Sequence, residues 1–197
     1  MSIRRRLAAL AILICAAPAG VAQAESPRNN VATATIEEDG GRAFAFEWSV
    51  DRQRGGVVDH QNIAQAGARC TDCRATAIAF QIVIVEGQPE KLEPLNRAVA
   101  VNDQCARCEV YAGARQLVRV VDKPVRFTVR GALVLLDVRH DLRKLEGQDL
   151  TAGQLATELE AQEARVLDVL QNELVPRSGK SWKTLRKYDR RADDGDD

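Results

Sequence analysis

A short alternating segment, Asn-x-Ala-x-Ala, occurs three times and is the clearest pattern of polar and apolar positions in the chain. Its copies begin at Asn30, Asn62 and Asn96, which defines a repeating unit of about 33 residues. Alternation with a period of two residues is typical of a β-strand that buries one face. The pattern therefore predicts three equivalent strands, each with small side chains on its buried face.

A second alternating run follows in each unit, over residues 43–47, 77–81 and 112–116. One face of each run carries alanine with glutamine or glutamate, and the other face of the first two runs carries Phe, Trp and Ile. Asp39-Gly40-Gly41 separates the first pair of runs, and such glycines accept the positive φ angles of a hairpin turn. We therefore predict three β-hairpin-like repeats, which either stack as a short solenoid or pair into one curled sheet.

The pattern changes to a helical period after residue 127. The first apolar stripe consists of Leu135, Val138, Leu142 and Leu145. The second consists of Leu155, Leu159, Val166, Val169 and Leu170. Gly147 is a stop signal for the first helix, and Thr151 with Gln154 forms a capping box before the second. Two such helices with a short connection predict an antiparallel hairpin.

These patterns divide the chain into a mainly-β repeat domain at residues 25–126 and a helical hairpin at 127–176, which is an α+β fold. Residues 177–197 form a charged tail, and its polar composition predicts disorder.

Residues 1–24 have the composition of an export signal. Arg4 to Arg6 are followed by a short apolar run and by the cleavage pattern Ala22-Gln23-Ala24.

Export places the protein outside the cytoplasm, either secreted or in the cell envelope, with a mature chain that starts at Glu25. Loss of three arginines with the signal leaves 25 basic and 28 acidic residues, a net charge of −3. So mild a charge gives no indication of nucleic acid as a partner. A component of the cell envelope is the partner class that this destination favours.

Four cysteines remain in the mature chain, in two CxxC motifs that are 35 residues apart: Cys70, Cys73, Cys105 and Cys108. An oxidising destination favours disulfides, and the place of each motif in the turn of its own repeat favours local bridges. One structural zinc held by all four thiolates is the alternative. A thioredoxin-type redox centre is a third interpretation, but it requires a βαβ context that this sequence lacks.

Catalytic motifs are absent from the sequence. It contains no HExxH, no GxSxG and no phosphate-binding glycine loop. Its two histidines are His60, in a polar stretch that predicts a surface loop, and His140, on a charge-rich helix that predicts solvation. We assign no catalytic residue and no cofactor, with zinc as the alternative at the cysteines.

The combination of Asn62-x-Ala-x-Ala, both CxxC motifs and the run 77–83 resembles a family of exported actinobacterial proteins of unknown function. Pro124-Val125-Arg126-Phe127-Thr128 and the helices that follow resemble the same family. Some members carry the label peptide zinc metalloprotease, but this chain lacks the motif such an activity needs. The sequence thus predicts a secreted, non-enzymatic binding or scaffolding module of the cell envelope, with a zinc-binding protein or a thiol- or zinc-dependent enzyme as the alternative.

Overall fold

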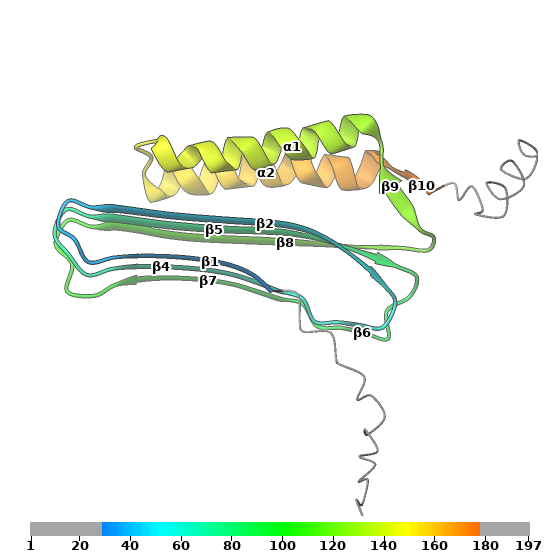
Figure 1. Cartoon of the computed structure of the whole chain (residues 1–197), viewed down its shortest axis with the longest axis horizontal. Coiled ribbons are helices and arrows are strands. Elements are labelled where there is room, and N and C mark those ends of the chain that lie inside the picture. The colour runs from blue at the N-terminus through cyan, green and yellow to red at the C-terminus, as the bar shows by residue number, and fades with distance from the viewer. Residues whose placement is uncertain (1–28, 178–197) are drawn as a thin grey trace, which may run out of the picture.

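The computed structural model describes residues 29–177, so the predicted signal peptide and almost all of the predicted tail lie outside the described residues. The described chain runs through strands, two long helices and a final short strand (Figure 1). The elements are β1 (Asn29–Ile36), β2 (Arg42–Arg54), β3 (Val57–Val58), β4 (Gln61–Ala68), β5 (Arg74–Glu86), β6 (Lys91–Leu92), β7 (Leu95–Asn102), β8 (Glu109–Val121), β9 (Val125–Phe127), α1 (Val129–Lys144), η1 (Leu145–Gly147), α2 (Ala152–Asn172) and β10 (Leu174–Pro176).

Three turns of a parallel β-solenoid form the first part of the molecule. Strands β1, β4 and β7 make one parallel sheet, and β2, β5 and β8 make the other. Asn30, Asn62 and Asn96 are direct neighbours across the first sheet, so the sequence repeat is also the structural repeat. The prediction of an α+β fold built from three repeated β units is confirmed, and of the two predicted arrangements the chain adopts the solenoid.

The two strands of each repeat do not pair with each other, which differs from a true hairpin. Every ladder in the two large sheets joins equivalent strands of successive repeats, and the turn after β1 carries the chain from one sheet to the other. Gly40 has φ of 70° in that turn, as its sequence predicts. The turn signal is therefore correct, but local sequence could not distinguish a tight hairpin from the corner of a solenoid, since both need this backbone geometry.

A layer of alanine fills the space between the two sheets near the turns that precede β2, β5 and β8. The buried members of this layer are Ala32, Ala34, Ala64, Ala66, Ala68, Ala75, Ala77, Ala79 and Ala114, with Cys70 and Cys73 at its margin. Because alanine projects only a methyl group, a continuous layer of it allows two sheets to pack close together. Farther along the strands the inward residues become Val58, Val83 and Val85, and Figure 1 shows the sheets diverging toward β6.

The bulky face of the β2-β5-β8 sheet packs against the helical hairpin (Figure 1). Ile78, Phe80, Ile82 and Ile84 of β5 are fully buried there, with Trp48 stacked on Phe80. Both predicted stripes face this contact and are buried. Thr128 caps α1, and Thr151 with Gln154 forms the predicted capping box of α2. Among the described residues, no helix combines the length and the apolar composition needed to cross a bilayer.

A short antiparallel ladder closes the hairpin at its open end. Leu174, Val175 and Pro176 of β10 pair with β9, and the backbone N–H of Thr128 donates to the carbonyl of Glu173 at 2.9 Å. Neither strand shows a recognisable pattern in the sequence, since each contains only three residues. The ladder fixes the end of α2 beside the start of α1.

An asparagine ladder runs from one repeat to the next, and it is buried at Asn30 and Asn62. The Asn30 amide donates to Asn62 Oδ1 at 2.8 Å, and the Asn62 amide donates to Asn96 Oδ1 at 2.8 Å. Asn62 also donates to the carbonyls of Ala79 and Arg115 in the opposite sheet, both at 3.0 Å. The ladder therefore joins the three repeats and bridges the two sheets at once.

The packing of the hairpin predicts the effect of a buried charge. Leu142 and Val166 are both completely buried, so Leu142→Asp or Val166→Asp should lower the free energy of unfolding by at least about 3 kcal/mol. Leu133→Asp is the matched control, because Leu133 lies on the same helix as Leu142 but is 56% exposed. Thermal unfolding of the three variants measures the difference, and equal midpoints for all three would contradict the packing.

The asparagine ladder predicts a second stability effect. Asn62→Ala removes the amide from the centre of the ladder, with its hydrogen bonds to Asn30, Asn96 and the carbonyls of the opposite sheet, which should cost about 2–3 kcal/mol. Asn102→Ala, at the exposed end of β7, should change the free energy of unfolding by less than about 0.5 kcal/mol. Urea titration distinguishes the two outcomes. A neutral Asn62→Ala variant would show that the ladder does not stabilise the stack.

Candidate functional site

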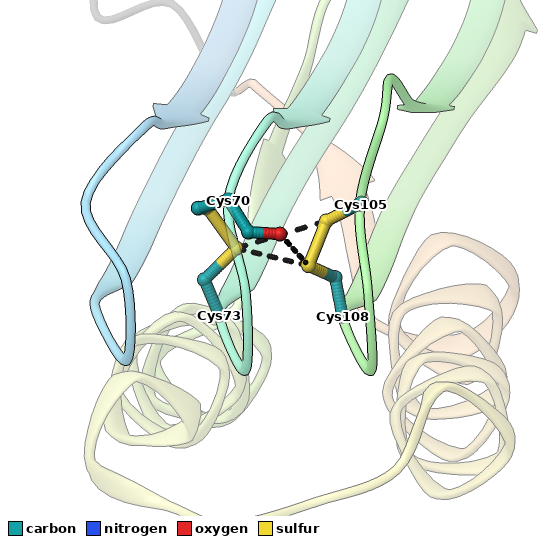
Figure 2. A group of neighbouring side chains, drawn as sticks. All are labelled: Cys70, Cys73, Cys105 and Cys108. Carbon is teal, nitrogen blue, oxygen red and sulfur yellow. Dashed lines mark hydrogen bonds between the residues drawn. A yellow bond between two sulfur atoms is a disulfide. The ribbon is translucent and has the colours of Figure 1, made fainter.

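The two CxxC motifs occupy equivalent turns that stack on each other (Figure 2). One turn joins β4 to β5 and the other joins β7 to β8. The turns are linked through the backbone, because the N–H of Asp72 donates to the carbonyl of Ala106 at 2.9 Å and the N–H of Glu109 donates to the carbonyl of Cys73 at 3.0 Å. The repeat thus places the second cysteine pair directly beside the first.

All three turns adopt a left-handed backbone at the same position. Gly40 has φ of 70°, Asp72 has φ of 57° and Arg107 has φ of 55°. Glycine adopts this conformation without steric cost, whereas other residues do so at some cost in energy. In the second and third turns the non-glycine residue is the one just before the last cysteine of its motif. The two turns that adopt this geometry at non-glycine residues are therefore the two that carry cysteine pairs.

The sulfur atoms within each motif lie at disulfide distance. Cys70 Sγ is 1.98 Å from Cys73 Sγ, and Cys105 Sγ is 1.87 Å from Cys108 Sγ. The two pairs also touch, since Cys73 Sγ lies 3.1 Å from Cys108 Sγ and 3.8 Å from Cys105 Sγ (Figure 2). Cys70 and Cys73 are buried, and the other two cysteines are half-buried. The four sulfurs form a single cluster, which spacing along the chain alone could not establish.

An ion pair on the surface joins the same two turns. The Arg107 guanidinium donates two hydrogen bonds of 2.5 Å to the Asp72 carboxylate. These hydrogen bonds lower the pKa of Asp72 and raise the pKa of Arg107. The pair therefore stabilises the fold above the ordinary pKa of aspartate, and this contribution is lost as the pH falls through the lowered value. Both groups are exposed to solvent, so the contribution is small.

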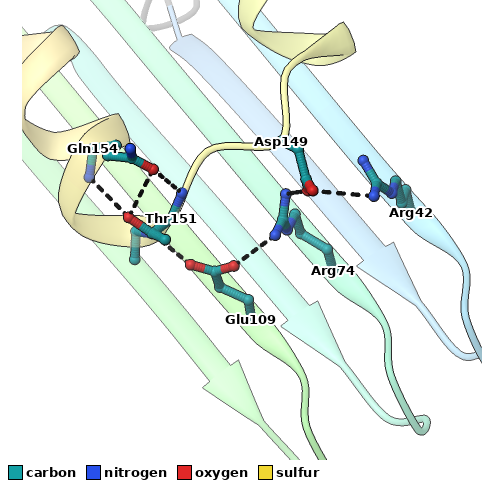
Figure 3. Close-up of polar contacts among 7 residues, drawn as sticks. Arg42, Arg74, Glu109, Asp149, Thr151 and Gln154 are labelled. Atoms are coloured by element: carbon teal, nitrogen blue, oxygen red, sulfur yellow. Dashed lines mark hydrogen bonds and ion pairs between the residues drawn. The ribbon is translucent and has the colours of Figure 1, made fainter.

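A second polar network connects the cysteine turns to the helices (Figure 3). Arg74, which follows Cys73, is 2.8 Å from Glu109 and 2.5 Å from Asp149 in the α1–α2 connection. Glu109, which follows Cys108, accepts a hydrogen bond of 2.6 Å from the backbone N–H of Ala152 at the start of α2. The first residues of β5 and β8 thus hold the helix connection at the same end of the solenoid as the cysteine cluster.

The histidines lie away from this cluster. The prediction that His60 is a surface loop residue is wrong: its side chain is buried, with Nε2 2.9 Å from Gln53 Oε1 and Nδ1 3.7 Å from Asp51. Its polar partners lie in β2, so the polar residues next to His60 in the sequence do not indicate its burial. His60 precedes β4 and Cys70 follows it, so a strand of roughly 26 Å separates them. Cys70 and His60 are therefore too far apart to act together as a catalytic cysteine–histidine pair. His140 is exposed on α1, as predicted.

A small cavity at the other end of β2 and β5 has a positive charge. Its volume is about 140 Å³, and its lining consists of Arg52, Gln53, Arg54, Glu86 and Arg177. Three guanidinium groups surround one carboxylate there. Burial lowers the pKa of Arg52, and the charge of Arg177 lowers it further. The electrostatics of this cavity favour small anions over cations.

A scan against protein-family models, a search of curated proteins and a search of solved structures each found no match to this chain. The resemblance to exported actinobacterial proteins therefore stays a prediction. The properties of the cysteine cluster are inferred from its geometry alone.

Sequence reasoning identified all four cysteines but missed the groups that hold them. The signal was available in the repeat: Arg74 and Glu109 occupy equivalent positions with opposite charge, directly after the last cysteine of each motif. Opposite charges at adjacent positions of parallel strands attract each other. The contact with the start of α2 could not be predicted, because nothing local specifies which sheet edge the helix connection meets.

The network predicts a cost for removing Glu109. Glu109→Ala deletes one of the two carboxylate partners of Arg74 and the acceptor of the Ala152 N–H, and should lower the free energy of unfolding by about 2 kcal/mol. Glu109→Gln keeps an acceptor for the N–H and should cost about half as much. Glu93→Ala, in an exposed ion pair with Lys91, is the control and should be nearly neutral. Chemical denaturation gives all three values, and an unaffected Glu109→Ala variant would contradict the anchoring role.

Proposed function

We propose that the protein is an exported, non-enzymatic binding or scaffolding module of the cell envelope, cross-linked by the disulfides Cys70–Cys73 and Cys105–Cys108. The observation that carries this proposal is an asymmetry between the two sheets. The β2-β5-β8 sheet is covered by helices, while the outer face of the β1-β4-β7 sheet has no helix over it in the described part of the chain (Figure 1). A solenoid with one bare face is well suited to binding, because its side chains stand in regular rows.

The residues on this bare face support a role in contact with another molecule. They alternate along each strand with alanines and asparagines, which are buried in β1 and β4 and exposed in β7. The face consists of Val31, Thr33, Thr35, Ile63, Gln65, Gly67, Leu95, Arg97, Val99 and Val101. Val31, Leu95 and Val101 are between 41% and 51% exposed. Apolar groups among hydroxyl and amide groups on a flat surface provide both dispersion contacts and hydrogen bonds.

The two cysteine pairs support export. Both lie at disulfide distance, and disulfides persist in oxidising compartments such as those outside the cytoplasm. Each pair closes a turn whose backbone is left-handed at a non-glycine residue, whereas the first turn has Gly40 at this position and no cysteine. The bridges thus reinforce the two turns whose backbone is the more costly to form.

Export predicts a defined N-terminus. The protein from the producing cell should begin at Glu25, because Ala22-Gln23-Ala24 is a small-residue cleavage pattern. N-terminal sequencing of the extracytoplasmic fraction tests this, with a cytoplasmic enzyme as the fractionation control. A soluble cytoplasmic product that retains Met1 would overturn the proposed localisation.

Envelope binding is tested by placing a photo-crosslinking amino acid on the bare face. Gln65 is an exposed residue of β4, and Arg139 on α1 is the matched exposed control on the helical side. The group at Gln65 should capture an envelope component in intact cells, and the group at Arg139 should not. Equal capture from both sides, or none from Gln65, would contradict binding through this face.

The disulfides predict a loss of stability when one pair is removed. The double variant Cys70→Ser with Cys73→Ser should lower the free energy of unfolding by roughly 2 kcal/mol, because only a short loop is closed. The second bridge should remain intact. Peptide mapping without reductant determines the pairing directly. Bridges between the two motifs would reject the local pairing.

A further inference from the structure

The contact between the two cysteine pairs has a chemical consequence that neither pair has alone. All four Sγ atoms lie within 4.8 Å of one another. The shortest distance between the pairs is 3.1 Å, and a second is 3.8 Å. Two independent structural bridges do not need such closeness.

The dimensions of the cluster match those of a tetrahedral zinc site. Zinc binds cysteine sulfur at about 2.3 Å, which places neighbouring sulfurs of a tetrahedron about 3.8 Å apart. Between the pairs, the Cys73–Cys105 distance of 3.8 Å already has this value, the Cys73–Cys108 distance of 3.1 Å is shorter, and no pair of sulfurs is more than 4.8 Å apart. Within a pair, the sulfurs must separate by about 2 Å once their bond is broken, which rotation about the Cα–Cβ bonds supplies. The backbone turns, with Cα atoms 6.1 Å and 5.8 Å apart within the pairs, need not move.

We propose that the four cysteines form a redox-gated zinc site: two local disulfides when oxidised, and one Zn²⁺ held by four thiolates when reduced. The disulfide and zinc interpretations of the CxxC motifs are then two states of one site. The proposal concerns the reduced protein and stands separately from the role of the bare face.

Reduction of the two disulfides precedes binding of the metal. A dithiol reductant supplies two electrons and two protons to each disulfide, which breaks the S–S bond, gives two thiols and leaves the reductant as a disulfide. Four thiols then bind one Zn²⁺ and release four protons, which gives a tetrathiolate of net charge −2. In the reduced, metal-free state the Cys108 thiol can donate to the carbonyl of Cys70, whose oxygen is 2.9 Å from its sulfur.

The two states connect the molecule differently. Each disulfide closes a single turn within its own repeat, so neither links the second repeat to the third. A shared zinc bonds to both turns and would link them covalently through the metal. The reduced zinc form should therefore hold β7 and β8 on the stack at least as firmly as the oxidised form, whereas the reduced metal-free form should not.

Metal titration of the reduced mature protein tests this site. The protein is reduced with a phosphine under argon, freed of reductant and titrated with Co²⁺ and then Zn²⁺. We expect one Co²⁺ per chain with the absorption bands of a tetrahedral tetrathiolate, and complete displacement by Zn²⁺. All four thiols should resist alkylation until a chelator is added, and zinc should restore the unfolding midpoint lost on reduction.

Two variants locate the site. Cys105→Ser with Cys108→Ser should lose the tetrathiolate spectrum, although the first disulfide can still form. Asp72→Asn removes the surface ion pair, keeps all four cysteines and should retain both spectrum and stoichiometry.

Absence of metal binding by the reduced wild type, or protection of fewer than four thiols, would overturn the proposal. If the natively purified protein already contains zinc and no disulfide, the site stands and the disulfide part of the proposed function fails.

Discussion

Close contact between the two parallel sheets is the constraint on which the rest of this structure depends. The inward positions near the cysteine turns are alanine in repeat after repeat, and a larger side chain there would push the sheets apart. A layer this thin buries little apolar surface per residue. The solenoid must therefore gain its main hydrophobic contact elsewhere. It does so on the outer face of the β2-β5-β8 sheet, where the helical hairpin packs. Phe80 and Trp48 stack in this second core.

The sequence predicted the repeat and both faces of the strands because a period of two residues reports burial directly. Asn30, Asn62 and Asn96 marked the correct register, since equivalent residues of a solenoid become neighbours. Which strand pairs with which was harder to predict from the sequence. Asp39-Gly40-Gly41 specifies a turn but not whether the next strand returns to the same sheet. The burial of His60 was missed because its partners, Gln53 and Asp51, belong to another strand.

The cysteine cluster illustrates the same division between local and non-local information. The spacing within a CxxC motif allows a local bridge, and that much was visible in the sequence. The approach of the two motifs to 3.1 Å results from the stacking of repeats, so it could be recognised only once the parallel register was known. Arg74 and Glu109 then extend this stacked end to the helices, so that the turns, the sulfur atoms and the start of α2 form one continuous structure.

The offset between the two sheets gives the solenoid unequal ends. Across the two sheets, β1 lies against both β2 and β5, and β4 lies against both β5 and β8, but β7 lies chiefly against β8. Ala98 and Ala100 of β7 are consequently exposed, although their counterparts in the first two repeats are buried. Because each repeat of a solenoid is stabilised by its neighbours, we expect the third repeat to open at the lowest free energy. Amide hydrogen exchange should then proceed from the third repeat inward, and the turn of Cys105 and Cys108 should be the first of the two cysteine turns to meet solvent.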